Sequence, residues 1–250
     1  MTFVHEVGEQ VHLGNPIENG FVHANGELVD DGDHSPFSFI NGRGLGQGTV
    51  EEVYLSATVY DQYGDEYVSV DATDDDDPYV ARGIGIRGDG DENSTYFDNI
   101  RLTDGTLIED FSSGNLDPWT AQREEWWRID TETTYVGDYS AVHDGDGVSE
   151  WLVSNYGDGL PYYPTLGDEI EFWFRISDTN AGVWVGVGLE YDPEEGGITT
   201  YQIRLPGAGT FDDELRIVKD DRHNPLATAS ADRIEDEWLR AVVRYGEGDK

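Results

Sequence analysis

Apolar and polar residues alternate along short stretches of this chain, with the period of two that is typical of half-buried β-strands. Between residues 53 and 60, Val53, Leu55, Ala57 and Val59 fall on one face of a predicted strand and Tyr, Ser and Thr residues on the other. Further strands are expected at 67–70, 84–86, 96–102, 107–111, 126–129, 151–153, 169–176, 183–190, 201–205, 215–219 and 238–245. Turn residues separate these stretches and none has a helical period, so the pattern predicts an all-β fold, an antiparallel β-sandwich.

Residues 1–49 show a weaker pattern. Their short apolar groups are broken by Gly, Asn and Asp, and Asn-Gly pairs at 19–20, 25–26 and 41–42 indicate turns. This part is expected to be either a small strand-and-turn module or an extended arm that docks on another subunit. The sandwich is expected to occupy residues 50–250.

The middle of the chain, residues 81–119, reads ARGIGIRGDGDENSTYFDNIRLTDGTLIEDFSSGNLDPW. Its first part, GIGIR…YFDNIRL, resembles the last strands of the concanavalin-like and laminin-G-like jelly rolls, a family of sugar-binding domains and glucanases. Its second part, EDF…GNLDPW, resembles the first strand of the same family. The resemblance implies a jelly-roll sandwich and places the end of one sandwich next to the start of another.

The order of the segments differs from the order in that family. There, a strand similar to EWLRAVVRYGEGDK is followed by a hairpin similar to VYLSATVYDQYGDEYVSVDAT, but here the hairpin lies at the front. Residues 50–103 would therefore supply the closing strands and 107–250 the opening strands of one jelly roll. Three explanations stay open: a circular permutation joined at 103–106, strand exchange with a neighbouring subunit, or a fragment of a longer protein with two incomplete domains.

The formal net charge is −38, from 53 acidic and 15 basic residues, and only Lys219 and Lys250 are lysines. Such a surface repels itself in dilute buffer, whereas molar salt shortens the screening length to roughly 3 Å. The charge therefore predicts a halophilic protein, archaeal or viral. It also argues against nucleic-acid binding, because no basic stripe is present to contact phosphates.

The chain has no cysteine, so it has neither disulfides nor a thiolate metal site. No apolar run approaches the roughly 20 residues of a membrane span, and the first residues lack the basic and apolar regions of a secretion signal. We therefore expect a soluble chain without membrane insertion and without a secretion signal.

An alternating acidic loop is the candidate metal site. Asp89, Asp91 and Asn93, with Asp98 downstream, offer the oxygen ligands that Ca²⁺ prefers. The loop is no EF-hand, since Ser94 replaces the turn glycine. The family resemblance also implies a structural calcium ion.

A glycoside hydrolase is the least favoured interpretation. Laminarinase-type members of the family carry a Glu-x-Asp-x-x-Glu signature, and residues 190–195, EYDPEE, match its letters. A retaining pair of carboxyls must lie roughly 5 to 5.5 Å apart, but Pro193 and Gly196-Gly197 place these acids in a hairpin turn. We expect no catalytic residues and no enzymatic activity.

A carbohydrate-binding face is a better candidate, because flat aromatic rings beside polar groups suit a sugar ring. If the apolar sides of the strands form the core, six residues gather on the opposite face, with Gly186 and Gly188 leaving room between them. The six are Trp173, Arg175, Trp184, Glu190, Gln202 and Arg204. The alternative is a solvated or subunit-facing sheet.

These observations lead to one functional hypothesis and two alternatives. The first is a non-enzymatic structural protein of a halophilic archaeal virus, such as a tail fibre, spike or capsid decoration, assembled in the host cytoplasm and carried on the virion. Residues 1–49 would contact other virion subunits, the sandwich would bind host-surface glycans, and the protein would be a homo-oligomer. The alternatives are a haloarchaeal extracellular carbohydrate-binding or adhesion module and, third, a laminarinase-like hydrolase.

Overall fold

The computed structural model describes residues 50–89, 91–146, 149–177, 182–205, 214–220, 225–232 and 234–247, together with four short strands before residue 50. Contacts within the chain divide it into two units, residues 1–49 and 50–250. In the first unit β1 (Thr2–Val4) pairs with β2 (Gln10–His12), and β3 (Phe21–Val22) pairs with β4 (Leu28–Val29). Both pairs are antiparallel.

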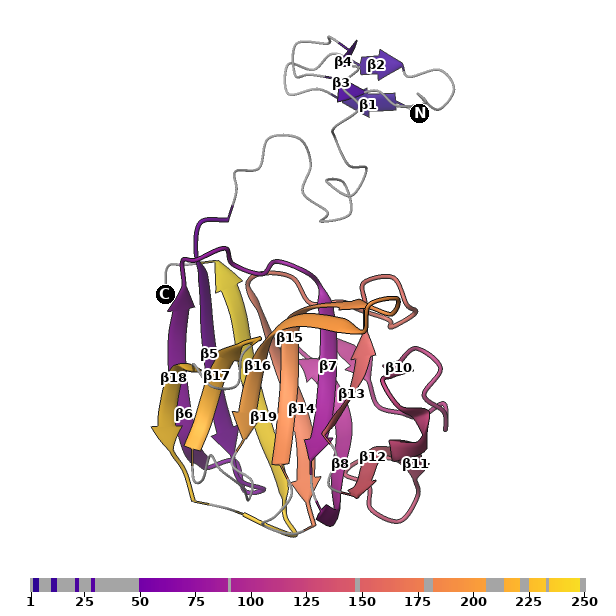
Figure 1. Cartoon of the computed structure of the whole chain (residues 1–250), viewed down its shortest axis with the longest axis vertical. Helices are drawn as coiled ribbons and strands as arrows, with labels where there is room; N and C mark the ends of the chain where they lie inside the picture. Colours follow the sequence, from indigo (N-terminus) through magenta and orange to yellow (C-terminus); the bar gives the residue numbers. More distant parts are fainter. Residues whose placement is uncertain are drawn as a thin grey trace. The chain divides into compact units, whose positions relative to one another are not determined.

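The second unit consists of two antiparallel sheets, drawn as two layers in Figure 1. The seven-stranded sheet has the order β10 (Thr120–Ala121), β13 (Glu150–Ser154), β7 (Gly83–Asp89), β15 (Gly182–Asp192), β16 (Gly197–Leu205), β17 (Glu214–Lys219), β18 (Pro225–Ser230). The eight-stranded sheet has the order β11 (Trp127–Asp130), β12 (Ser140–Asp146), β8 (Asp91–Leu102), β14 (Asp168–Ile176), β19 (Trp238–Glu247), β5 (Val53–Tyr60), β6 (Glu66–Asp74), and β9 (Leu107–Glu109) pairs with β8. The predicted antiparallel β-sandwich is confirmed.

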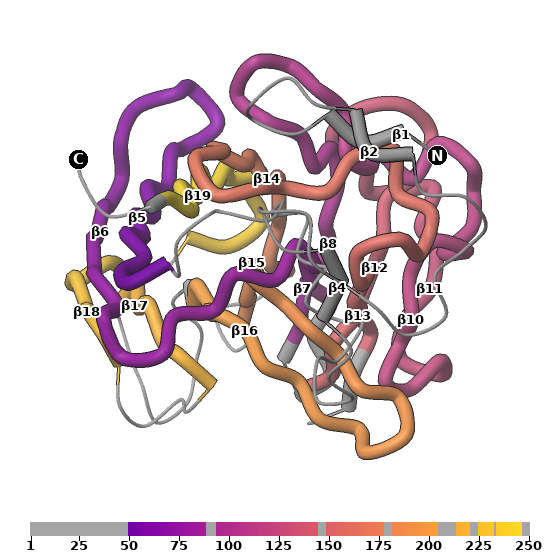
Figure 2. Tube along the Cα trace, turned by 90° about the horizontal axis from the view of Figure 1, so that it is seen from above, coloured from indigo at the N-terminus to yellow at the C-terminus, as the bar shows by residue number. Residues whose placement is uncertain are grey.

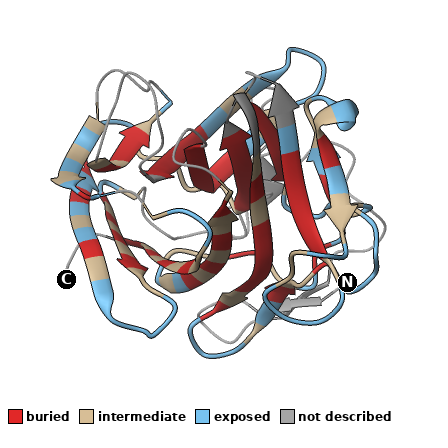
Figure 3. Ribbon diagram, turned by 90° about the horizontal axis from the view of Figure 1, so that it is seen from below, coloured by how far each residue is buried: buried red, intermediate tan, exposed pale blue. Residues whose placement is uncertain are grey.

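The hydrophobic core lies between the two sheets. Along β5 every second residue is buried, from Val53 to Val59, and along β14 the buried positions are Ile170, Phe172, Phe174 and Ile176. Figure 3 shows buried stretches along the strands and exposed stretches in the turns. The alternation of the sequence thus decides which side chains enter the core and which point outward.

The segments on either side of residues 103–106 belong to the same sandwich. β8 lies between β12 and β14, β7 lies between β13 and β15, and β5 pairs with β19 so that Val53 is opposite Glu247. All these pairs form within one chain. The turn that joins β8 to β9 is tight, since Leu102 N donates to Thr106 O at 2.8 Å and Gly105 has a φ of +94°.

Among the described residues there is one short 3₁₀ turn, Glu124–Trp126, and no α-helix. None of these residues forms a helix with the length and apolar character needed to cross a membrane.

Candidate functional site

The six residues predicted to bind a glycan lie on two different sheets. Trp173 and Arg175 are on β14 of the eight-stranded sheet, whereas the other four are on β15 and β16 of the seven-stranded sheet. Those four are Trp184, Glu190, Gln202 and Arg204. Since outward side chains of the two sheets point to opposite sides of the sandwich, the prediction that the six form one site is wrong. Alternation shows that a side chain points outward but not to which sheet its strand belongs.

A row of alternating tryptophans and arginines crosses the outer face of the seven-stranded sheet. Trp151 of β13, Arg87 of β7, Trp184 of β15 and Arg204 of β16 are neighbours in register. The Arg87 guanidinium lies 4.7 Å from the Trp184 ring and 5.6 Å from the Trp151 ring, and the Arg204 guanidinium lies 4.9 Å from the Trp184 ring. We call these four residues the arginine–tryptophan ladder. All four are only 4 to 7% exposed. The faces of the two tryptophan rings therefore pack on arginines of the same chain and are not open to a ligand.

The glycines of β15 leave no room for a sugar. A Cβ atom on Gly186 would lie 3.1 Å from Cζ3 of Trp151, and one on Gly188 would lie 3.1 Å from Oη of Tyr245. The space above these glycines is therefore filled by aromatic side chains of the same chain. Gly188 also has a φ of +61°, a conformation that favours glycine.

The acids of residues 190–195 lie at the exposed end of the β15–β16 hairpin, which projects from the sandwich in Figure 2. Asp192 Oδ1 accepts hydrogen bonds from Glu194 N at 2.8 Å and Glu195 N at 3.2 Å, and Gly196 has a φ of +70°. The expected hairpin turn is present. Asp192, the aspartate of the Glu-x-Asp-x-x-Glu match, caps that turn and therefore has a structural role.

A second group of aromatic residues lies on the outer face of the eight-stranded sheet. The Tyr135 ring stacks on the Trp173 ring at 3.7 Å and 14°, and the Trp238 ring lies 5.7 Å from Tyr135. The Arg240 guanidinium lies 4.5 Å from the Tyr60 ring and 5.9 Å from the Trp173 ring. We call Tyr60, Tyr135, Trp173, Trp238 and Arg240 the aromatic platform. Tyr135 is 41% exposed and the other four are half-buried.

The buried Asp98 of β8 holds the loop that carries Tyr135. Its Oδ2 accepts hydrogen bonds from the backbone N–H groups of Tyr135 at 2.8 Å and Val136 at 3.0 Å. Asp98 is fully buried and lies opposite Trp173 in the register of β8 and β14. Burial raises the pKa of the Asp98 carboxyl to about 6, although these backbone donors oppose the shift.

The same loop is fixed at its two ends. Asp130 Oδ2 accepts a hydrogen bond from Thr133 N at 2.7 Å, and Ser140 Oγ donates one to Thr133 O at 2.7 Å. Tyr135 is thus presented by an anchored loop. Sequence reasoning missed it because residues 131–139 have no hydrophobic period.

Charged groups surround the aromatic platform. Arg240 Nη1 lies 3.1 Å from Glu171 Oε1, and Glu171 is opposite Arg101 in the register of β14 and β8. Arg175 Nη2 lies 3.0 Å from Asp236 Oδ1. Burial raises the pKa of the Tyr135 hydroxyl, and the Arg101 and Arg240 guanidiniums oppose this shift. The Arg101 and Arg240 guanidiniums are therefore close enough to Tyr135 to interact electrostatically with its hydroxyl group.

The predicted calcium ligands do not form one set. Asp98 is seven residues from Asp91 and five from Asn93 along β8, which at the rise of an extended strand is about 23 Å and about 16 Å. Calcium ligands lie roughly 2.3 to 2.6 Å from the ion, so Asp98 cannot join the others, and its carboxylate anchors the loop instead. The side chains of Asp89, Asp91 and Asn93 lie outside the described residues, and a calcium ion bound by them stays a prediction.

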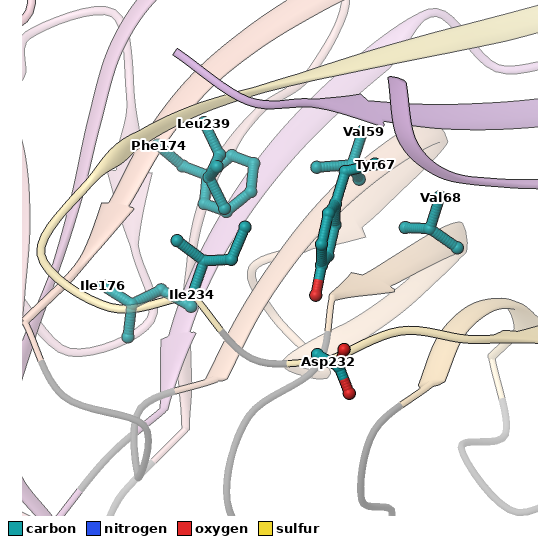
Figure 4. A pocket seen from close by; sticks show the side chains of 8 residues that line it. All are labelled: Val59, Tyr67, Val68, Phe174, Ile176, Asp232, Ile234 and Leu239. Atoms are coloured by element: carbon teal, nitrogen blue, oxygen red, sulfur yellow. The ribbon is translucent and has the colours of Figure 1, made fainter. Parts of the chain in front are cut away.

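No group of three or more His, Asp or Glu side chains is placed to hold a metal ion in the part of the chain that the structure describes. A cavity of about 20 Å³ lies between the eight-stranded sheet and the segment that joins β18 to β19, and it has room for a single water molecule. Its lining residues are Val59, Tyr67, Val68, Phe174, Ile176, Asp232, Ile234 and Leu239 (Figure 4). This cavity is too small for a sugar.

Comparison of the chain with protein-family models, with curated proteins and with solved structures found no match.

Proposed function

We propose that the chain is a non-enzymatic carbohydrate-binding β-sandwich that acts in molar salt, and that the aromatic platform is its binding site. The observation that carries this proposal is the exposed Tyr135 ring, stacked on Trp173 and flanked by Trp238. The C–H face of a sugar ring packs on such a ring, and its hydroxyl groups bond to nearby polar side chains. Arg240 and Glu171 provide a donor and an acceptor beside Tyr135.

The anchoring of Tyr135 supports binding as the role of this face. An exposed aromatic side chain on a free loop would lose conformational entropy when a ligand binds, which lowers affinity. Here the two hydrogen bonds to Asp98 and the stacking on Trp173 fix the ring beforehand. The site is therefore preorganised.

The wider proposal places this domain on the virion of a halophilic archaeal virus, as a tail fibre, spike or capsid decoration with a sandwich of the concanavalin-like jelly-roll type. It is supported by the charge of −38, which suits molar salt, and by the family resemblance of residues 81–119. Residues 1–49 would contact other virion subunits. A host adhesion module with the same platform is the alternative, and mass spectrometry of purified particles and of cell envelopes distinguishes the two.

A binding experiment tests the platform directly. Polysaccharides of different composition are titrated into the protein in molar KCl, and Tyr135→Ala is compared with Tyr63→Ala. Tyr63 serves as the control because it is an 82% exposed tyrosine of the β5–β6 turn, outside the stack that Tyr135 forms on Trp173. Tyr135→Ala should weaken binding about tenfold, the loss expected for one stacked ring, and Tyr63→Ala should not. Equal affinities of the two variants for every sugar would refute the proposal.

A further inference from the structure

Arginines and acids are nearly equal in number among the outward residues of the strands beneath the aromatic platform. On the central strands β8, β14 and β19, four arginines point outward among the described side chains, and three acids accompany them. The arginines are Arg101, Arg175, Arg240 and Arg244, and the acids are Asp98, Glu169 and Glu171. The whole chain has 53 acidic residues for 15 basic ones. On these three strands the outward charges are therefore nearly balanced, whereas the whole chain is strongly acidic.

The positive groups are closest together beside Tyr135. Arg101 and Arg240 lie on either side of Glu171, which is opposite Arg101 in register and 3.1 Å from Arg240. Two guanidiniums thus flank one carboxylate. The other nearby acid, Asp98, is fully buried and accepts its hydrogen bonds from the Tyr135 loop.

The guanidiniums on this face are half-buried, and the Arg175 and Arg240 side chains are each 28% exposed. Among the described residues, the Nε atoms of Arg101, Arg175 and Arg240 are buried and have no hydrogen-bond partner, so an anion would be contacted through the outer Nη groups. A guanidinium presents its N–H groups as a planar fork that matches a carboxylate or a sulfate. An anionic group at the edge of the aromatic platform would meet such forks.

Molar salt makes direct contact necessary for charge recognition. The screening length falls to roughly 3 Å, so attraction at longer range is lost. In molar salt the protein can therefore distinguish a charged ligand from a neutral one only where the charge makes a direct hydrogen bond. An arginine whose guanidinium stacks on an aromatic ring, as that of Arg240 does on Tyr60, is held in place for that contact.

We propose that the ligand of the aromatic platform is an acidic carbohydrate, whose sugar ring stacks on Tyr135 while its carboxylate or sulfate binds Arg240 and Arg101. This inference rests on the proposed function and adds the substrate class. It assigns different tasks to neighbouring residues: Tyr135 provides affinity for any pyranose ring, and the two arginines provide selectivity for the charge.

The test is calorimetric titration in molar KCl with three oligosaccharides of equal length: a neutral glucan, a polyuronate and a sulfated glucan. The wild type is compared with Arg240→Gln and with Arg244→Gln. Arg244 is the matched control because it points outward from the same strand, four residues away, over Tyr54. A hydrogen-bonded charge pair changes affinity about tenfold or more, so the wild type should prefer an acidic sugar by that factor.

Arg240→Gln should remove this preference and weaken binding of the neutral glucan by only about threefold, because Gln keeps a donor and at most one neutral hydrogen bond is lost, whereas Arg244→Gln should change neither. The titrations with the polyuronate and the sulfated glucan show which anion is bound.

Equal binding of neutral and acidic sugars by the wild type would overturn the inference and leave the proposed function standing, provided that Tyr135→Ala still weakens both. Absence of binding to all three sugars would overturn both proposals. If Arg240→Gln unfolds, Arg101→Gln replaces it, because Arg101 is the second arginine beside Glu171.

Discussion

Two rows of side chains cross the outer faces of the two sheets, and each spans four strands. On the seven-stranded sheet the row is Trp151, Arg87, Trp184, Arg204. On the eight-stranded sheet it is Tyr60, Arg240, Trp173, Asp98. Both rows alternate aromatic rings with charged groups, yet the first is 4 to 7% exposed and the second supports the exposed Tyr135.

The difference between the rows begins at one position. Where the first row ends in Arg204, which packs on Trp184, the second ends in Asp98, which accepts hydrogen bonds from a loop. That loop places Tyr135 on Trp173 and leaves its outer side to solvent. Similar residue types thus stabilise the fold on one face and present a ring for binding on the other.

The largest effect is expected from truncating the arginine–tryptophan ladder. Trp184→Ala removes a ring that is 4% exposed and packs on two guanidiniums, so the free energy of unfolding should fall by about 3 to 5 kcal/mol. Trp173→Ala, at a half-buried position, should cost less. Denaturant unfolding in molar KCl measures both. Equal losses would show that the two faces do not differ as described.

The next effect concerns the pH dependence set by Asp98. Its pKa is about 6 in the folded state and 3.8 for the ordinary carboxyl, so the folded state binds the proton more tightly. As the pH rises from 4 to 6, ionisation of Asp98 therefore lowers the free energy of unfolding, in total by about 3 kcal/mol. Asp98→Asn does not titrate in this range and can still accept both backbone hydrogen bonds.

The difference in stability between Asp98→Asn and the wild type isolates this group, because all other carboxyls are common to both. We expect it to shift in favour of the Asp98→Asn variant by about 3 kcal/mol between pH 4 and pH 7. Denaturant unfolding at a series of pH values gives the curve. A difference that is flat with pH would show that Asp98 has an ordinary pKa.

A smaller effect is expected from filling the space beneath Trp151. A Cβ atom on Gly186 would lie 2.9 Å from Oγ1 of Thr200 and 3.1 Å from Cζ3 of Trp151. Gly186→Ala should therefore cost about 1 to 3 kcal/mol of unfolding free energy by overpacking, measured as a lower melting temperature. Gly197→Ala is the control, since nothing lies within 4 Å of its Cβ position. Equal melting temperatures would contradict the packing of the arginine–tryptophan ladder.

The smallest effect on stability is expected at Tyr135. Because this ring is 41% exposed, Tyr135→Ala should change the free energy of unfolding by about 1 kcal/mol or less. Its effect should fall on sugar affinity instead. A stability loss as large as that of Trp184→Ala would mean that Tyr135 belongs to the core.

Much of the fold was predictable from the alternation of residues. The strands of 53–60 and 169–176 and the outward position of Trp173 and Trp184 follow from a period of two. The sheet to which each strand belongs does not follow, because β14 and β15 are consecutive in the chain but lie in different sheets. Alternation alone therefore predicts a shared face for Trp173 and Trp184, which the two sheets separate.

The site was less predictable than the fold. Tyr135 lies in a loop with no period, and its position depends on hydrogen bonds to Asp98, which is 37 residues away in sequence. The acids near Asp98 in sequence predict a calcium site for it. Its role depends on burial and on the loop that covers it, which are properties of the folded chain.

The tryptophan indole N–H signals in an NMR spectrum test the central claim most directly. The chain has seven tryptophans, and single Trp→Phe variants assign their signals. On addition of an acidic oligosaccharide in molar KCl, the signals of Trp173 and Trp238 should shift while those of Trp151 and Trp184 stay in place. Shifts confined to Trp151 and Trp184 would place the binding site on the seven-stranded sheet and contradict the account.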